Sequence, residues 1–174
     1  MRKLREKDRL GLVGAIIFDA DGTLFDSSNA FYHLVRDIFS KRKWPLKSKE
    51  SIVSVLGMTN KQIANVLIPK KLRSNKQVIA EWERDMEKRW LEHYLPRHVK
   101  LAVGAKQVLK ELHRMGFRIG LVSNGSAKEI PLYIRHASIE SLLEVVVTAD
   151  DVRRPKPFPD PLEEAAKRLG MPIS

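Results

Sequence analysis

The sequence contains no cysteine, which excludes disulfide bonds and every metal site that depends on thiolate ligands. No apolar run approaches the ~20 residues that a membrane-spanning helix requires. Aromatic residues are also scarce, at 7% of 174 residues, and no aromatic motif of an RNA-binding domain is present. With 43% hydrophobic and 30% charged residues, the composition is typical of a soluble globular protein with one core, or a core and a small insert.

The N-terminal stretch MRKLREKDRLGLVGAIIF places basic residues before the mostly apolar run Leu10–Phe18, as a signal peptide does. No small-residue cleavage site follows this run, because the next residues are Asp-Ala-Asp. We interpret the stretch as a basic tail that leads into a buried strand, with a targeting segment as the alternative. The expected location is therefore the cytoplasm.

Basic residues outnumber acidic ones by 32 to 21, which gives a formal net charge of +11. Such an excess is compatible with nucleic acid, an anionic membrane surface or small phosphorylated ligands as partners. The charges are dispersed over separate segments: RKLREKDR, KRK, PKKLR and EWERDMEKRW. We therefore expect a solvated basic surface, with no specific nucleic-acid partner and no membrane partner.

Three short apolar runs rich in β-branched residues predict strands, at residues 12–18, 117–124 and 142–150. The nearly continuous apolar character of the first run is typical of a strand covered on both faces. A helical pattern at 104–116 ends in a glycine and leads directly into the second strand. Helix followed by strand, repeated, predicts an α/β fold with a Rossmann-like parallel sheet in three layers.

About seventy residues of helical pattern separate the first strand from the helix at 104–116, too many for a single crossover. Ser27 or Ser28 is a candidate cap for the first helix, and a longer amphipathic stretch is expected to end before Pro96. We therefore predict an inserted helical subdomain at residues 27–98. Residues 1–26 and 99–174 would form the core.

The first strand ends in IIFDADGTLFD, which places two carboxylates two residues apart beside a glycine. Ligands of open α/β sheets bind at the carboxyl ends of the strands, where Asp19 falls. Asp21 follows in the turn, and Gly22 with Thr23 would let backbone N–H groups face an anion. Paired carboxylates and an anion nest suit phosphoryl transfer, with one carboxylate as nucleophile and a divalent cation to offset like charges. An ordinary turn is the alternative, since Asp and Gly favour turns.

The two later strands also end in polar residues at the same edge of the sheet. Ser123 and Asn124 end the second strand, and Lys156 follows the third, between Pro155 and Pro157. A hydroxyl, a backbone amide and a lysine would hold phosphoryl oxygens and balance their charge. This agreement between three strand ends favours the phosphoryl site over the simple turn.

This ordered set of motifs resembles the haloacid dehalogenase superfamily of phosphohydrolases. The superfamily's first motif appears as FDADGTL, its second as LVSN and its third as KPFPDPLEEAAKRLG. The resemblance spans Ala15 to Gly170 and looks most like the phosphoglycolate phosphatase-like subgroup. The helical insert lies where that family carries its cap domain.

The resemblance implies a Mg²⁺-dependent phosphomonoester hydrolase that acts on a small phosphorylated metabolite. Asp19 would be the nucleophile that becomes aspartyl phosphate, and Asp21 the general acid and then the general base. Ser123, the Asn124 amide and Lys156 would bind the phosphate, together with the Gly22 and Thr23 turn. Mg²⁺ would bind the Asp19 carboxylate and the Asp21 carbonyl.

One part of the family pattern is absent from the sequence. A fourth motif, an acidic pair that completes the magnesium site, should follow shortly after Gly170, but the sequence ends at Ser174. Asp150, Asp151 and Asp160 flank the third motif and are candidate substitutes, although Asp160 is more simply a helix cap. We therefore expect a truncated core with impaired hydrolysis. The alternative is a non-catalytic remnant that binds anions or a partner chain.

The same departure predicts an unpaired edge at the first strand, Val13–Phe18. An apolar edge strand without charged or proline blockers recruits another chain. We expect two copies to pair through this strand, the basic N-terminal segment to cover it, or the fold to be marginally stable.

The dispersed charge leads to a test. We expect binding to a labelled DNA duplex to be weak and to fall steeply between about 50 and 200 mM salt, because only non-specific phosphate contacts contribute. Fluorescence anisotropy measures this, and submicromolar, sequence-selective binding at physiological salt would contradict it.

Overall fold

The structure is a computed structural model that describes residues 14–171. Its main sheet has three parallel strands in the order β1 (Ala15–Asp19), β4 (Arg118–Val122) and β5 (Val145–Val147). Asp19 pairs with Val122, and Val122 pairs with Val147, so the three strands end at one edge. The predicted α/β class and parallel sheet are confirmed.

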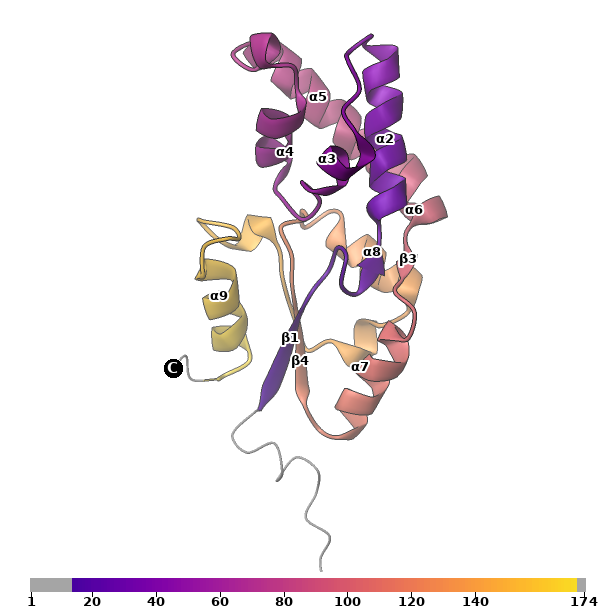
Figure 1. Cartoon of the computed structure of the whole chain (residues 1–174). Helices are drawn as coiled ribbons and strands as arrows, with labels where there is room; N and C mark the ends of the chain where they lie inside the picture. The colour runs from indigo at the N-terminus through magenta and orange to yellow at the C-terminus, as the bar shows by residue number, and fades with distance from the viewer. Residues whose placement is uncertain (1–13, 172–174) are drawn as a thin grey trace, which may run out of the picture.

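Helices cover both faces of this sheet (Figure 1). One face packs against α7 (Ala105–Arg114) and α8 (Ile130–Ala137), and the other against α9 (Asp160–Arg168). Within β4 the side chains alternate, because Ile119 and Leu121 belong to the first interface and Val122 to the second. This alternation makes three layers, and it explains why the central strand is apolar from Ile119 to Val122.

The strands differ from the predicted ones at their ends. β5 has only 3 residues, because the 3₁₀ turns η3 (Glu140–Leu142) and η4 (Ala149–Asp151) replace the rest of the expected strand. The Asp151 carboxylate accepts hydrogen bonds from the Thr148 N–H at 2.8 Å and the Thr148 hydroxyl at 2.6 Å. This local capping box turns the chain immediately after Val147.

β1 is half-buried along its length rather than covered on both faces as expected. The reason is its place at an edge, where among residues 14–171 it pairs only with β4. Leu12 and Val13, the start of the predicted strand, lie outside the described residues. Pairing of two copies through this edge stays a prediction.

A two-stranded antiparallel ribbon connects the sheet to the helices above it (Figure 1). In this ribbon, β2 (Phe25–Asp26) pairs with β3 (Lys100–Leu101), so the chain leaves and returns side by side. Between them lie α2 (Ser28–Lys41), α3 (Lys49–Val53), α4 (Asn60–Leu67), η1 (Lys70–Leu72), α5 (Lys76–Arg89), the π-helix η2 (Trp90–Tyr94) and α6 (Leu95–His98). The sequence analysis missed the ribbon, because strands of two residues carry no detectable periodicity.

The long amphipathic segment does not end before Pro96 as predicted. It runs on through the π-helix η2 into α6, in which Pro96 is the second residue. Trp82 and Trp90 both pack, but against different neighbours. Trp82 stacks on Trp44 with ring centroids 5.9 Å apart, whereas Trp90 faces Tyr133 at 6.4 Å. Eight residues at ~100° per residue leave the two indoles about 80° apart around the helix.

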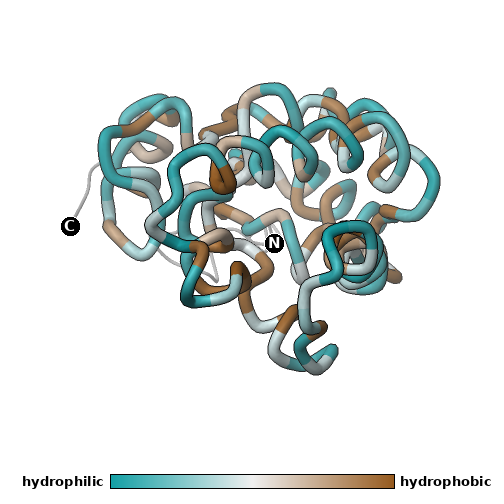
Figure 2. The backbone as a smooth tube through the Cα atoms, turned by 90° about the horizontal axis from the view of Figure 1, so that it is seen from above, coloured by the Kyte–Doolittle hydropathy of each residue, from teal (hydrophilic) through white to brown (hydrophobic). Residues whose placement is uncertain are grey.

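The helices carry hydrophilic and hydrophobic segments in alternation along the backbone (Figure 2). The apolar side chains of α2 are buried: Ala30, Phe31, Leu34, Val35, Ile38 and Phe39. Within residues 14–171, no helix combines the length and hydropathy that crossing a bilayer requires.

Two neighbouring positions of α7 provide a matched test of the core. Leu109 is 0% exposed and Val108 is 49% exposed. Leu109→Ala should lower the free energy of unfolding by about 2–5 kcal/mol, since it leaves a cavity against the sheet. Val108→Ala should change it by less than about 0.5 kcal/mol. Urea denaturation of both variants checks the difference, and equal effects would contradict the assigned helix face.

Candidate active site

Asp19, the last residue of β1, contacts the lysine that follows β5. The Lys156 Nζ donates to Asp19 Oδ1 at 2.6 Å and to the Val122 carbonyl at 3.2 Å. The Ala20 N–H donates to the same Asp19 oxygen at 2.7 Å. Two strand ends that are far apart in sequence thus meet in one ion pair, and the Asp19 side chain remains 42% exposed.

The Asn124 side chain fixes the position of Lys156. Asn124 Oδ1 accepts from the Lys156 N–H at 2.9 Å, and Asn124 Nδ2 donates to the Lys156 carbonyl at 3.1 Å and to the Gly57 carbonyl at 2.9 Å. This buried amide therefore joins the end of β4, the loop after β5 and a loop of the helical subdomain. Only its backbone remains for the phosphate contact that the sequence analysis expected.

Ser123 lies one residue beyond the pairing of Asp19 with Val122. Its N–H donates to the Val147 carbonyl at 2.9 Å, and its hydroxyl oxygen accepts from the Gly125 N–H at 3.0 Å. The hydroxyl proton has no acceptor within residues 14–171, so it is free to donate to a ligand.

The turn after β1 uses its own backbone N–H groups. Gly22 adopts φ 74°, a left-handed conformation that favours glycine. Its N–H donates to the Phe25 carbonyl at 2.9 Å, and the Thr23 N–H donates to the Ala20 carbonyl at 3.3 Å. The structure therefore does not leave these two N–H groups free for an anion, contrary to the expected nest. Gly22 and Thr23 instead form the turn that presents Asp21.

Two hydroxyl groups hold the Asp21 carboxyl. Ser27 Oγ donates to Asp21 Oδ1 at 2.6 Å, and the Tyr133 hydroxyl donates to the same oxygen at 3.0 Å. Ser27 precedes α2 as expected, but it makes no side-chain cap, because its hydroxyl serves Asp21. The sequence analysis missed Tyr133, which lies on α8 and carries no local motif.

Burial raises the pKa of Asp21 above its ordinary value. The Ser27 and Tyr133 hydrogen bonds offset part of this rise, and the nearby Asp19 charge adds to it. Asp21 therefore keeps its proton to higher pH than an exposed aspartate does, as a general acid requires.

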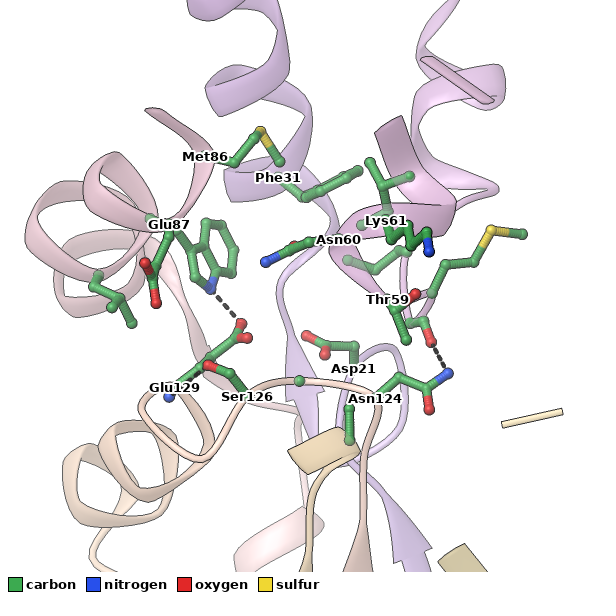
Figure 3. Close-up of a pocket in the computed structure, with 18 of the residues that line it drawn as sticks. Asp21, Phe31, Thr59, Asn60, Lys61, Met86, Glu87, Asn124, Ser126 and Glu129 are labelled. Atoms are coloured by element: carbon green, nitrogen blue, oxygen red, sulfur yellow. Dashed lines mark hydrogen bonds between the residues drawn. The ribbon is translucent and has the colours of Figure 1, made fainter. Parts of the chain in front are cut away.

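A cavity of about 260 Å³ lies between the helical subdomain and the strand ends. Asp21 and Glu129 point into it from below, whereas Phe31 and Met86 reach it from the helices above (Figure 3). One wall is the segment 56–61. Apolar side chains and a few polar groups are typical of a small-molecule site.

Glu129 is a cavity residue that the sequence analysis did not identify. It immediately precedes α8, and its carboxylate accepts a hydrogen bond from the Trp90 indole N–H of the helical subdomain (Figure 3). Desolvation, followed by the charge of Asp21, raises the pKa of Glu129 to about 7. Its only sequence signal is an acid in the short polar run before an apolar helix.

Oxygen ligands for a divalent cation are present beside Asp19 and Asp21. Asp19 Oδ2 and the Asp21 carbonyl oxygen accept no hydrogen bond from any residue in 14–171. Hard cations such as Mg²⁺ prefer such oxygens, and Mg²⁺ commonly binds one or two carboxylates together with water and substrate phosphate. The Asp19 carboxylate and the Asp21 carbonyl therefore fit Mg²⁺ as a partial ligand set.

The candidate substitute ligands have other partners. Asp150 accepts from the Ala127 N–H at 2.7 Å, Asp151 pairs with Arg168 at 2.8 Å, and Asp160 pairs with Arg154 at 2.8 Å. Asp160 is the first residue of α9 and not its cap, which is Pro159. Over the described part of the chain, no group of three His, Cys, Asp or Glu side chains is arranged to hold a metal ion.

The chain is similar to known proteins over most of its length. The family profile of the haloacid dehalogenase-like hydrolases matches residues 16–173. Pyrophosphatase PpaX of Bacillus cereus is 21% identical over 91% of this chain and 69% of its own length. Phosphoglycolate phosphatase of Salmonella typhimurium is 25% identical over 94% of this chain and 72% of its own length. A crystal structure of a haloacid dehalogenase-like hydrolase from Bacteroides fragilis matches with a TM-score of 0.82 at 21% identity, over 91% of this chain and 74% of that one.

The raised pKa of Glu129 leads to a prediction about stability. Between its ordinary value of 4.5 and about 7, the folded chain binds more protons at this site than the unfolded chain does. The free energy of unfolding should therefore fall as the pH rises through this window, with a contribution of roughly 2–3 kcal/mol from Glu129. Urea denaturation at pH 5 and pH 7 should show this fall in the parent chain and a smaller one in Glu129→Gln. Identical pH dependence in the two chains would contradict the raised pKa.

Proposed function

We propose, because this chain belongs to the haloacid dehalogenase-like hydrolases, that its phosphatase activity uses Asp19 as nucleophile and Asp21 as acid and base on a small phosphomonoester. The observation that carries this proposal is the convergence of two carboxylates and a lysine at one sheet edge. Lys156 contacts Asp19 directly, while Asp21 faces the adjoining cavity.

In the first step, Asp19 Oδ2 attacks the phosphorus, and the bond to the leaving-group oxygen breaks. Lys156 holds Asp19 Oδ1, so the other carboxylate oxygen is the one left to attack. Asp21 donates its proton to the departing oxygen, which leaves as an alcohol. The Ser123 hydroxyl and Lys156 would bind the non-bridging phosphoryl oxygens.

In the second step, the Asp21 carboxylate takes a proton from water as the water attacks the aspartyl phosphate. The acyl phosphate bond breaks, inorganic phosphate forms and the Asp19 carboxylate is regenerated. The hydrogen bonds from Ser27 and Tyr133 hold Asp21 in place in both steps. One carboxyl group can therefore act first as acid and then as base.

We also propose that the Asp19 carboxylate and the Asp21 carbonyl hold Mg²⁺. The cation would offset the like charges of the attacking carboxylate and the phosphoryl group. The support is the Asp21 carbonyl oxygen, which accepts no hydrogen bond within residues 14–171 and lies two residues from the Asp19 carboxylate. One oxygen of that carboxylate would attack the phosphorus and the other would bind the cation.

The division into a core at 1–26 and 99–174 and a cap at 27–98 is part of the same proposal. Residues of α2, α4, α5 and η2 line the cavity from above, and the β2–β3 ribbon is where the helical part joins the core. Curated relatives are named for pyrophosphate and phosphoglycolate, so a small phosphorylated metabolite is the proposed substrate class.

Variants of Asp19 and Asp21 test the proposal with p-nitrophenyl phosphate and magnesium. Asp19→Asn should reduce phosphate release to background, because the nucleophile is lost. Asp21→Asn should lower kcat by about 10²–10⁴-fold, since the leaving group is no longer protonated. Asp26→Asn is the matched control, because this exposed aspartate lies outside the cavity, and it should keep parental activity. Parental turnover in Asp19→Asn would overturn the nucleophile assignment, and no turnover in the parent would favour a remnant that only binds anions.

A further inference from the structure

The proposed reaction leaves one ionisable group of the cavity without a role. Glu129 points into the same space as Asp21, from the start of α8 (Figure 3). It makes no helix cap, so its carboxyl is not engaged by the N–H groups of its own helix.

Glu129 has acceptor capacity that no protein group uses. The Trp90 indole N–H donates to one carboxylate oxygen, and a backbone hydrogen bond from Ser126 also stabilises the carboxylate. Tyr133 lies close enough to affect the pKa of Glu129, but its single hydroxyl proton is donated to Asp21 at 3.0 Å. A carboxylate can accept about four hydrogen bonds, so Glu129 can accept from a donor in the cavity.

The charged residues around the cavity differ in whether a protein group or water already neutralises or screens them. Glu87 is paired with Lys128 at 2.8 Å, and Asp150 accepts from the Ala127 N–H. Lys61 lies on the wall opposite Glu129, where it is exposed to water and has no ion pair within residues 14–171 (Figure 3). Water screens an exposed charge strongly, so the unpaired charge that acts on a buried leaving group is that of Glu129.

We propose that Glu129 selects the leaving group: it accepts a hydrogen bond from a hydroxyl or ammonium donor and disfavours leaving groups that carry a carboxylate or a second phosphate. The inference rests on the proposed function, because the leaving group enters this cavity only if the phosphoryl group lies at Asp19. A polyol or amino-alcohol phosphate fits the cavity under this rule. An anionic leaving group would place like charges together in a poorly solvated space.

Under this rule, the chain should disfavour the substrates for which its relatives are named. The leaving group of phosphoglycolate carries a carboxylate, and that of pyrophosphate is itself a phosphate. Glycerol 1-phosphate presents hydroxyl donors at a similar size, and phosphoethanolamine presents an ammonium. These compounds make a matched set, because they share the phosphoryl group and differ in the part that faces Glu129.

Binding to the Asp19→Asn chain tests the rule without turnover. Isothermal titration with magnesium at pH 8, above the pKa of about 7, compares glycerol 1-phosphate, phosphoethanolamine and 2-phosphoglycolate. We expect 2-phosphoglycolate to bind about tenfold more weakly than glycerol 1-phosphate. Adding Glu129→Gln should remove most of this difference, because glutamine keeps the acceptor for Trp90 and loses the charge. Phosphoethanolamine separates ammonium recognition from hydroxyl recognition. If Glu129 recognises the ammonium, Glu129→Gln should weaken phosphoethanolamine binding strongly, whereas binding of glycerol 1-phosphate should change little.

Glu140→Gln is the charge control, because Glu140 is an exposed glutamate outside the cavity. It should leave every ratio unchanged. The inference is overturned if the preference for glycerol 1-phosphate over 2-phosphoglycolate is the same with and without Glu129→Gln. It is also overturned if the chain with Glu129 binds 2-phosphoglycolate more tightly than glycerol 1-phosphate. Activity on p-nitrophenyl phosphate separates the two proposals: Asp19-dependent turnover without this selectivity removes only the inference, whereas absent turnover and absent binding remove both.

Discussion

The side-chain amide of Asn124 is the contact on which the geometry of the site depends. It bonds both backbone groups of Lys156 and the carbonyl of Gly57, so it joins the central strand end to the third motif and to the helical subdomain. Because these bonds fix the backbone at Lys156, its ammonium reaches Asp19 from 137 residues further along the chain. Replacing this buried amide is costly, because the backbone groups of Lys156 and Gly57 that it bonds would be left without a partner.

The environment separates the two carboxylates of the first motif. Asp19 faces a lysine and solvent, whereas Asp21 lies under two hydroxyl groups and close to Glu129, where burial raises its pKa. Two adjacent acids in different surroundings can take different parts in one reaction. The acid and base assigned to Asp21 thus depend on Ser27 and Tyr133 as much as on the motif itself.

The cavity is a product of chain topology. The β2–β3 ribbon brings the chain out of the sheet and back at one point, so the helices must pack over the strand ends. That packing places Trp90 of the helical subdomain against Glu129 of the core and leaves space above Asp21. The proposed leaving-group selection therefore uses residues from both parts of the chain. In the proposed phosphoryl chemistry, the reacting carboxyl groups of Asp19 and Asp21 belong to the core, while Ser27, at the start of the helical subdomain, holds Asp21.

The sequence by itself determined the α/β class, the parallel strands and the clustering of Asp19, Ser123 and Lys156. Periodicity and strand-end polarity are local signals, and parallel strands align their carboxyl ends. Only the tertiary structure decided that Ser27 and Tyr133 hold Asp21, that Glu129 meets Trp90, and that the Gly22 and Thr23 N–H groups stay within the turn. These contacts join residues up to 112 positions apart or depend on turn dihedral angles, and neither leaves a periodic pattern in the sequence.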